Sequence, residues 1–225
     1  MSSVHLTEWT TLFGSSLDNQ SNDVTIGSDG SIYITGTTRG GLDGQANKGL
    51  DDAFISKFNN DGEIQWTRLL GTSEDEAGYS IAIGSDNSIY VSGVTEGDLD
   101  GETSSSGQTE DVFISKFNSS GIKQWTKLLG VSGSYSSHNI GIDIGNDDSI
   151  CVTGNTLRNL DGEIITGGYD AFISKFNSDG DKQWSKLLGS SEYEFGEDLS
   201  IASDGSIYVI GDTKGDLDGQ TNAGE

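Results

Sequence analysis

The sequence predicts an all-β fold, a β-propeller built from four repeats of about 58 residues with four strands in each blade. Tryptophan recurs once in each repeat, with spacings of 57, 59 and 59 residues, at Trp9, Trp66, Trp125 and Trp184. The motif FISKFN recurs at the same period, beginning at Phe54, Phe113 and Phe172. Short apolar runs separated by Gly, Asp and Ser indicate strands and turns, and no stretch has the pattern of a long helix.

The second repeat shows the four expected strands most clearly. They are YSIAIGS, SIYVSGV, DVFISKFN and KQWTKLLG, which begin at residues 79, 88, 111 and 123. The first three runs are apolar on both alternating faces, which is typical of strands sandwiched between neighbouring sheets. The tryptophan run also carries charge, at Arg68, Lys127 and Lys186 in the different copies. We therefore expect the tryptophan strand to be outermost, where charge discourages pairing with other chains.

Residues 1–225 form one propeller domain or a propeller fragment, with repeat units at approximately 15–71, 72–130, 131–189 and 190–225 plus 5–14. An outer strand is expected at residues 6–14, so the last blade is either completed by this N-terminal strand or left incomplete. The chain stops at Glu225, where the other copies begin their third strand. A cut from a longer array is the favoured explanation, and a strand from a second chain or a blade that tolerates fewer strands are the others. An incomplete blade exposes an edge, which predicts self-association.

Charge and composition exclude several classes of partner. The chain has 36 acidic and 12 basic residues and a formal net charge of -24, which repels nucleic-acid phosphates and anionic lipid headgroups. We expect no nucleic-acid partner and no membrane insertion, because no apolar run is long enough to span a bilayer. The N-terminus shows no export signal. The lone cysteine, Cys151, excludes an intrachain disulfide and is expected to be a small buried apolar side chain.

An acidic loop follows the second strand of each copy, as GGLDGQ, GDLDGE, RNLDGE and GDLDGQ. Carboxylates two positions apart can bind one hard cation such as Ca²⁺, with backbone carbonyls as further ligands. The sequence therefore predicts a calcium site in each blade. Its candidate ligands are the loop aspartates and the aspartates that open the next strand: Asp43, Asp52, Asp98, Asp100, Asp111, Asp161, Asp170, Asp216 and Asp218. The alternative is a plain Asp-Gly turn in which the aspartate caps its own backbone, and both interpretations stay open.

A second acidic cluster enters the innermost strand, near the mouth of the expected central channel. Its members are Glu74, Asp75 and Glu76 in one copy and Glu192, Glu194, Glu197 and Asp198 in another. A solvated acidic loop is favoured here over a ligand site. Because the acids repeat once per blade, whereas catalysis depends on an asymmetric constellation, we expect the protein not to be an enzyme. The histidines, His5 and His138, suggest no metal site or triad.

The segments WTKLLG, SIAIGSDNSIYVSG, GDLDG and DVFISKFN together resemble the bacterial SBBP β-propeller repeat. The resemblance implies a module of a large secreted or surface protein, and some such proteins carry calcium-binding modules. We therefore expect an extracellular or cell-surface location and a non-enzymatic binding or scaffold role in adhesion or protein contact. A glycan-binding propeller is the alternative, with Tyr79, Tyr135, Tyr169 and Tyr193 as candidate sugar contacts. A hydrolase or lyase that uses the acidic channel mouth is the third hypothesis.

Overall fold

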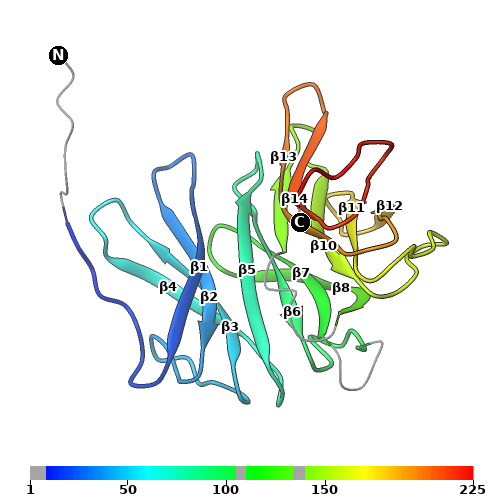
Figure 1. Cartoon of the computed structure of the whole chain (residues 1–225). Helices are drawn as coiled ribbons and strands as arrows, with labels where there is room; N and C mark the ends of the chain where they lie inside the picture. Colours follow the sequence, from blue (N-terminus) through cyan, green and yellow to red (C-terminus); the bar gives the residue numbers. More distant parts are fainter. Residues whose placement is uncertain (1–8, 105–109, 134–139, 225) are drawn as a thin grey trace.

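The structure, a computed structural model, describes residues 9–104, 110–133 and 140–224 (Figure 1). No helix among these residues is long and apolar enough to cross a membrane. The first sheet contains β1 (Asn19–Ile26), β2 (Ile32–Thr38), β3 (Asp52–Phe58) and β4 (Ile64–Leu70). The second contains β5 (Glu76–Ile83), β6 (Ile89–Thr95), β7 (Glu110–Phe117) and β8 (Lys123–Gly133). The third contains β9 (Gly141–Ile144), β10 (Ile150–Thr156), β11 (Asp170–Phe176) and β12 (Lys182–Leu188), and the last contains β13 (Glu194–Ile201) and β14 (Ile207–Thr213).

Each complete sheet is an antiparallel meander whose strands are paired in chain order, such as β1-β2-β3-β4. The tryptophan strands β4, β8 and β12 are the outermost ones, which confirms the predicted order within a blade. Tight turns join the first strand to the second and the third strand to the fourth, which only neighbouring antiparallel strands allow, and the longer acidic loop joins the second strand to the third. The all-β propeller fold that the repeats predict is thereby confirmed.

The sheets pack face to face in chain order, with the inner strands β1, β5, β9 and β13 in contact from one blade to the next (Figure 1). The core lies between the sheets. One apolar cluster joins Tyr33 and Ile55 of the first blade to Val91 and Phe113 of the second. The next cluster joins the second blade to the third in the same way. Burial on both faces explains why the central strands carry apolar residues at consecutive positions.

Among the described residues, the last sheet has two strands, and residues 9–14 do not complete it. Residues 9–14 pack instead against the first sheet. The Trp9 indole Nε1 donates a hydrogen bond to the Asn60 carbonyl at 2.7 Å, and the Phe13 ring packs edge-on against Phe54 and Phe58. Of the two expected arrangements, the structure has the incomplete blade.

The expected outer strand at residues 6–14 is wrong for its described part, because residues 9–14 form no strand. Residues 6–8 lie outside the described residues. The physical reason lies in the order of strands within a blade. An outer strand is paired with a third strand, as β4 is with β3, and the described part of the last sheet contains β13 and β14 only.

Candidate functional site: the acidic groove between the first two blades

The L-D-G segment of each acidic loop is a tight turn. Its aspartate has a left-handed backbone, with φ between 49° and 57°, and the following glycine also has a positive φ; the four aspartates are Asp43, Asp100, Asp161 and Asp218. The residues on either side pair with each other, as Leu42 does with Gln45. Two successive left-handed residues are the geometry of a two-residue hairpin turn, which Asp-Gly favours. Turn formation therefore accounts for the backbone of these loops.

The turn aspartates point back to the outer strand of their own sheet in two blades. Asp100 accepts a hydrogen bond from the Thr126 hydroxyl at 2.7 Å and forms an ion pair with Lys123. Asp161 forms the corresponding ion pair with Lys182 at 2.6 Å. In the first blade Ile64 stands where these lysines stand in the others. A lysine of the chain thus already neutralises the turn carboxylate in the second and third blades.

The residue two positions before the turn aspartate makes a different contact, within the loop itself. Asp98 accepts the backbone N–H of Ser104 at 2.8 Å, six residues later, and Asp216 accepts the N–H of Asn222 in the same way. Asn159 makes the equivalent bond to Ile165 at 3.1 Å. Because an amide oxygen replaces the carboxylate there, this loop contact does not depend on negative charge.

The aspartates that open the third strand, Asp52, Asp111 and Asp170, are buried. Asp52 Oδ2 accepts the backbone N–H of Lys48, and Asp170 Oδ2 accepts that of Thr166. Among the described residues, no group of three or more His, Cys, Asp or Glu side chains is arranged to hold a metal ion. The nine candidate ligands therefore divide among three separate places: the turn itself, the position two residues before the turn aspartate, and the start of the third strand. Calcium binding stays a prediction.

Buried carboxyl groups lie near one another where two blades meet. Glu76, at the start of β5, accepts hydrogen bonds from the Thr72 and Thr95 hydroxyls at 2.7 Å. Burial raises the pKa of Asp52 and of Glu76, and the charge of Asp52 adds to the increase at Glu76. Burial likewise raises the pKa of Asp170, which lies near the charge of Glu194. These acids bind protons more readily in the folded chain than in the unfolded one.

We expect the melting temperature to rise as the pH is lowered from 8 toward 5. An acid with a raised folded pKa contributes stability that is fully present below its unfolded pKa and is lost as the pH rises through the folded pKa. Asp29, Asp86 and Asp147 act in the opposite direction, because hydrogen bonds from nearby Ser residues lower their pKa, but their contribution is lost only at pH values below about 4.

The measurement is a series of melting curves at constant ionic strength for the wild type and for the double variant Asp52→Asn/Asp170→Asn. The variant should show a shallower dependence of melting temperature on pH. Asp98→Asn is the control, because Asn159 already fills the equivalent position in another loop. Equal slopes in the wild type and the double variant would contradict the role of these buried acids.

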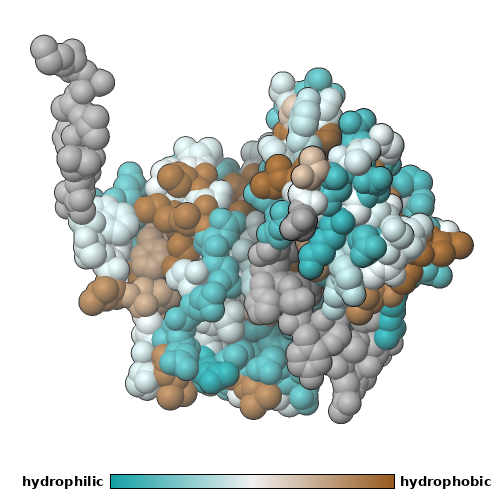
Figure 2. Space-filling view, in the orientation of Figure 1, coloured by the Kyte–Doolittle hydropathy of each residue, from teal (hydrophilic) through white to brown (hydrophobic). Residues whose placement is uncertain are grey.

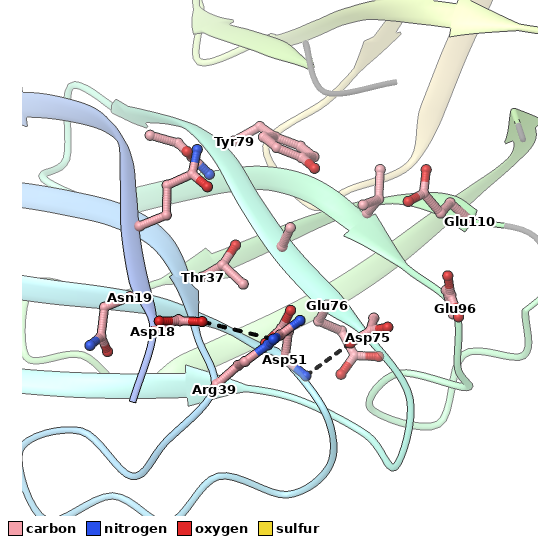
Figure 3. Close-up of a pocket in the computed structure, with 14 residues that line it drawn as sticks. Asp18, Asn19, Thr37, Arg39, Asp51, Asp75, Glu76, Tyr79, Glu96 and Glu110 are labelled. Atoms are coloured by element: carbon pink, nitrogen blue, oxygen red, sulfur yellow. Dashed lines mark hydrogen bonds and ion pairs between the residues drawn. The ribbon is translucent and has the colours of Figure 1, made fainter. Parts of the chain in front are cut away.

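Acidic side chains line a pocket of about 610 Å³ between the first two blades (Figure 3). Six carboxylates from both blades line it, and Arg39 is the basic side chain among the lining residues. These acids are Asp18, Asp51, Asp75, Glu76, Glu96 and Glu110. Figure 3 shows Asp18, Asp51, Asp75 and Glu76 close together, with Glu96 and Glu110 to one side and Tyr79 above them in this view. A hollow lined by one sign of charge concentrates ligands of the opposite sign.

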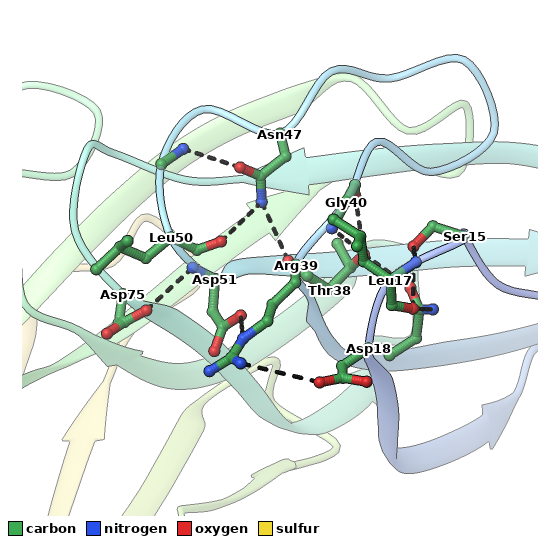
Figure 4. Close-up of polar contacts among 12 residues, drawn as sticks. Ser15, Leu17, Asp18, Thr38, Arg39, Gly40, Asn47, Leu50, Asp51 and Asp75 are labelled. Carbon is green, nitrogen blue, oxygen red and sulfur yellow. Dashed lines mark hydrogen bonds and ion pairs between the residues drawn. The ribbon is translucent and has the colours of Figure 1, made fainter.

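Ion pairs and hydrogen bonds to the backbone hold this pocket in place (Figure 4). The Arg39 guanidinium donates to Asp51 at 2.9 Å and lies 3.8 Å from Asp18. The backbone N–H of Asp51 donates to Asp75 Oδ1 at 3.0 Å, which joins the loop of the first blade to the second blade. Asn47 donates to the carbonyls of Thr38 and Leu50 and so shapes the loop that carries Asp51.

The charges of the pocket act on one another. The hydrogen bond and the charge of Asp51 raise the pKa of Arg39. Burial, together with the charges of Asp75 and Glu74, raises the pKa of Glu96. Burial raises the pKa of Tyr79 to about 12, with a further contribution from Glu110, so that hydroxyl stays protonated at neutral pH. The pocket is negative, and a cation placed in it would relieve this repulsion.

A second pocket, of about 420 Å³, adjoins the first one and is lined by the inner strands. The two share Gln20, Asn22 and Tyr79, and the second also contains Glu197 and Asp198 of the last blade. Of the acids predicted at the channel mouth, Asp75, Glu76, Glu197 and Asp198 line these pockets, whereas Glu74, Glu192 and Glu194 do not. Together, the two pockets form what we call the acidic groove.

Sequence reasoning found part of this groove. It singled out Asp75, Glu76, Tyr79, Glu197 and Asp198. It missed five residues of the larger pocket, which are Asp18, Arg39, Asp51, Glu96 and Glu110. A repeat alignment could have found Asp18, because it lies 57 residues before Asp75, at the repeat period. The other missed residues lie in loops or at a strand start, and no repeated motif marks them. Only the packing of two blades brings them together.

The other residues that the sequence analysis singled out are the cysteine, three tyrosines and the two histidines. Cys151 is buried, and burial raises the pKa of its thiol to about 11, so it behaves as the expected apolar side chain. The rings of Tyr169 and Tyr193 lie 6.2 Å apart, and Lys214 lies over Tyr193. Tyr135, His5 and His138 lie outside the described residues.

One segment of the chain matches a known family of repeats. Residues 65–100 match the SBBP family, described as a beta-propeller repeat. That segment is an SBBP-type repeat. It runs from the outer strand β4 through β5 and β6 to the acidic loop, so it crosses the junction between the first two blades. The acidic pocket thus lies at a junction that the SBBP repeat itself contains.

One known protein is similar in sequence to this SBBP-containing chain over most of the chain's length. A protein of Caulobacter vibrioides named regulatory protein FlaEY is 28% identical over 204 residues, which are 82% of this chain and 21% of that protein. The chain therefore spans about a fifth of the length of this relative.

Two solved structures are also similar. A protein of unknown function from Bacteroides caccae has 12% identity and a TM-score of 0.48, and the match covers 85% of this chain and 53% of that one. A catalytically inactive virginiamycin B lyase from Staphylococcus aureus has 14% identity and a TM-score of 0.25, over 88% of this chain and 86% of that one. Neither likeness is close enough to support an argument about function.

Proposed function

We propose that this chain is a non-enzymatic SBBP propeller module that binds a positively charged segment of a partner protein in its acidic groove. The observation that carries the proposal is the ring of six carboxylates around one pocket, with a single guanidinium among them. A lysine or arginine side chain of a partner would enter the hollow and form charge-assisted hydrogen bonds with these acids.

The charge distribution supports this proposal at two scales. The formal net charge of -24 attracts a basic partner from a distance and speeds its association. Inside the pocket, Asp75 is already engaged with a backbone N–H, whereas Asp18 is highly exposed and lies 3.8 Å from the guanidinium of Arg39. A partner's guanidinium can therefore reach Asp18 without breaking a buried contact.

The setting that we propose is a larger bacterial surface or secreted protein in which the module mediates adhesion or another protein contact. The family resemblance and the repetition of acidic loops support this setting. The word "regulatory" in the name of the Caulobacter vibrioides relative is compatible with a contact role. We also propose that calcium stabilises the acidic loops, and a separate experiment below tests this.

Glycan binding is the second candidate function, and one observation favours it. Tyr79 lies in the groove beside the amide side chains of Gln20 and Asn22. An aromatic ring together with amide donors and acceptors is suited to a sugar ring with its hydroxyl groups. A neutral glycan would depend on Tyr79 rather than on the carboxylates, which separates this candidate from the first.

Fluorescence anisotropy with a labelled nine-residue arginine peptide tests the proposal. The double variant Asp18→Lys/Glu96→Lys should bind the peptide at least about tenfold more weakly than the wild type, which corresponds to about 1.4 kcal/mol. The control Asp179→Lys/Asp204→Lys makes the same change in net charge at two turns outside the groove. Equal affinity of the two double variants for the peptide would show that the groove is not the binding site.

Two further arms separate the alternatives. A neutral glycan array should give no signal for the wild type, and signals lost in Tyr79→Ala would instead support the lectin candidate. Melting curves with calcium and with chelator test the metal, because a ligand that binds the folded state raises the melting temperature. An unchanged midpoint would remove calcium from the proposal and leave the peptide site standing.

A further inference from the structure

The two ends of the row of blades expose apolar side chains. On β1, at the first end, Val24 is 59% exposed and Ile26 is 69% exposed. On β14, at the other end, Tyr208 is 64% exposed and Ile210 is 65% exposed. Figure 2 shows hydrophobic surface on the side of the molecule that β1 occupies in Figure 1. We call these surfaces the β1 face and the β14 face.

Elsewhere in the chain the same positions are buried between blades. The counterparts of Val24 in the later repeats are Ile81, Ile142 and Leu199, and all three are buried. The counterparts of Tyr208 in the earlier repeats are Tyr33, Tyr90 and Cys151, and they are buried as well. The β1 face and the β14 face are therefore the two halves of an interface that this chain forms three times within itself.

The internal interface is polar as well as apolar. Asp23 of the first blade accepts hydrogen bonds from the Ser80 hydroxyl and the Ile81 N–H of the second blade, both at 2.9 Å. Asp143 of the third blade accepts the N–H of Ile201 of the fourth at 2.8 Å. Such contacts fix the register of one blade on the next. An exposed aspartate, Asp198, stands on the last blade at the position of Asp23.

The N-terminal segment covers only the outer part of the β1 end. An added Cβ on Gly62 would lie 2.5 Å from the Trp9 ring, and one on Gly121 would lie 2.9 Å from the Trp66 ring. The Thr11 hydroxyl donates to the Gly62 carbonyl at 2.9 Å, as Arg68 does to the Gly121 carbonyl at 2.8 Å. Residues 9–13 thus take the place of a preceding blade's outer strand, and the inner part of that place is the bare β1 face.

We infer that a second copy of this chain covers the β1 face with its own β13–β14 sheet. The last sheet consists of two inner strands, and the place that is open beside β1 is the place of inner strands. Two such head-to-tail contacts close a two-copy ring of eight sheets, which is within the range of four to eight blades known for propellers. The outer edge of β14 stays unpaired in this ring.

Sedimentation velocity and light scattering of the whole chain test the ring. The wild type should have twice the 23.8 kDa mass of the chain. The head variant Val24→Glu/Ile26→Glu and the tail variant Tyr208→Glu/Ile210→Glu should each have the mass of one chain. All four side chains are exposed, so folding should be kept, and circular dichroism checks it. Leu50→Glu/Ile164→Glu is the control, because it charges two exposed apolar positions outside both faces and should leave the mass doubled.

Mixing the two variants distinguishes a head-to-tail contact from a symmetric one. The head variant keeps an intact β14 face and the tail variant keeps an intact β1 face, so an equal mixture should regain the mass of two chains. A wild type that stays at one chain mass at all concentrations, or a mixture that stays monomeric, would overturn the inference. A wild-type mass that keeps rising with concentration would overturn the closed ring.

Discussion

Phe113→Ala should lower the free energy of unfolding by about 3–5 kcal/mol, the largest effect that we expect from any single substitution. Phe113 is fully buried in β7, at the centre of the apolar cluster that joins the first two blades. Alanine would remove most of the ring and leave a cavity that rigid sheets on both sides cannot close. The effect should therefore include both the lost burial and the cavity.

Urea denaturation followed by tryptophan fluorescence measures this effect. Ile122→Ala is the control, since Ile122 is an exposed apolar side chain in the turn that precedes β8. It should change the free energy of unfolding by less than about 0.5 kcal/mol. A loss below about 1 kcal/mol for Phe113→Ala would mean that the two sheets are not packed as described.

Gly93→Ala should lower the free energy of unfolding by about 3 kcal/mol, because an added methyl group has no room. A Cβ on Gly93 would lie 2.0 Å from the Ala77 carbonyl oxygen and 2.8 Å from the Phe113 ring. The carbonyl belongs to β5, whose pairing with β6 shifts by one residue next to Gly78. Backbone atoms on one side and a buried ring on the other leave no flexible group that could yield.

Gly101→Ala is the matched control for this substitution. Gly101 has a φ of +88°, and nothing lies within 4 Å of its added Cβ. It should cost about 1 kcal/mol for backbone strain alone. If Gly93→Ala and Gly101→Ala destabilise the chain equally in urea denaturation, the close approach of β5 to β6 is not what requires glycine at position 93.

The acidic groove and the end faces depend on different parts of the fold. The pocket that carries most of the acids lies between the first two blades, whereas the β1 and β14 faces lie at the ends of the row. Charge reversal at Asp18 and Glu96 should weaken peptide binding without changing the mass of the assembly. Substitutions on the end faces should change the mass and leave the pocket intact.

The Asp-Gly loops show how far a motif can be interpreted. Repetition of L-D-G correctly marked equivalent positions in four blades, and the Asp-Gly pair correctly indicated a turn. The proximity of Asp98 and Asp100 in sequence did not show that one carboxylate holds the loop and the other contacts the outer strand. The two side chains diverge because Asp98 precedes the hairpin turn, whereas Asp100 is the first left-handed residue of that turn.

The repeats by themselves determined the number of blades, the order of strands within a blade and the outer position of the tryptophan strand. These features are local, because strands that follow one another within a repeat pair with each other and the pattern of apolar residues sets which faces are buried. Tertiary structure alone decided that residues 9–14 pack on the first sheet, that six acids gather around one pocket and that the ends stay bare. Those features depend on contacts between segments that are separated in the sequence, by 51 residues for Trp9 with Asn60 and by 24 for Asp51 with Asp75, which no local pattern encodes.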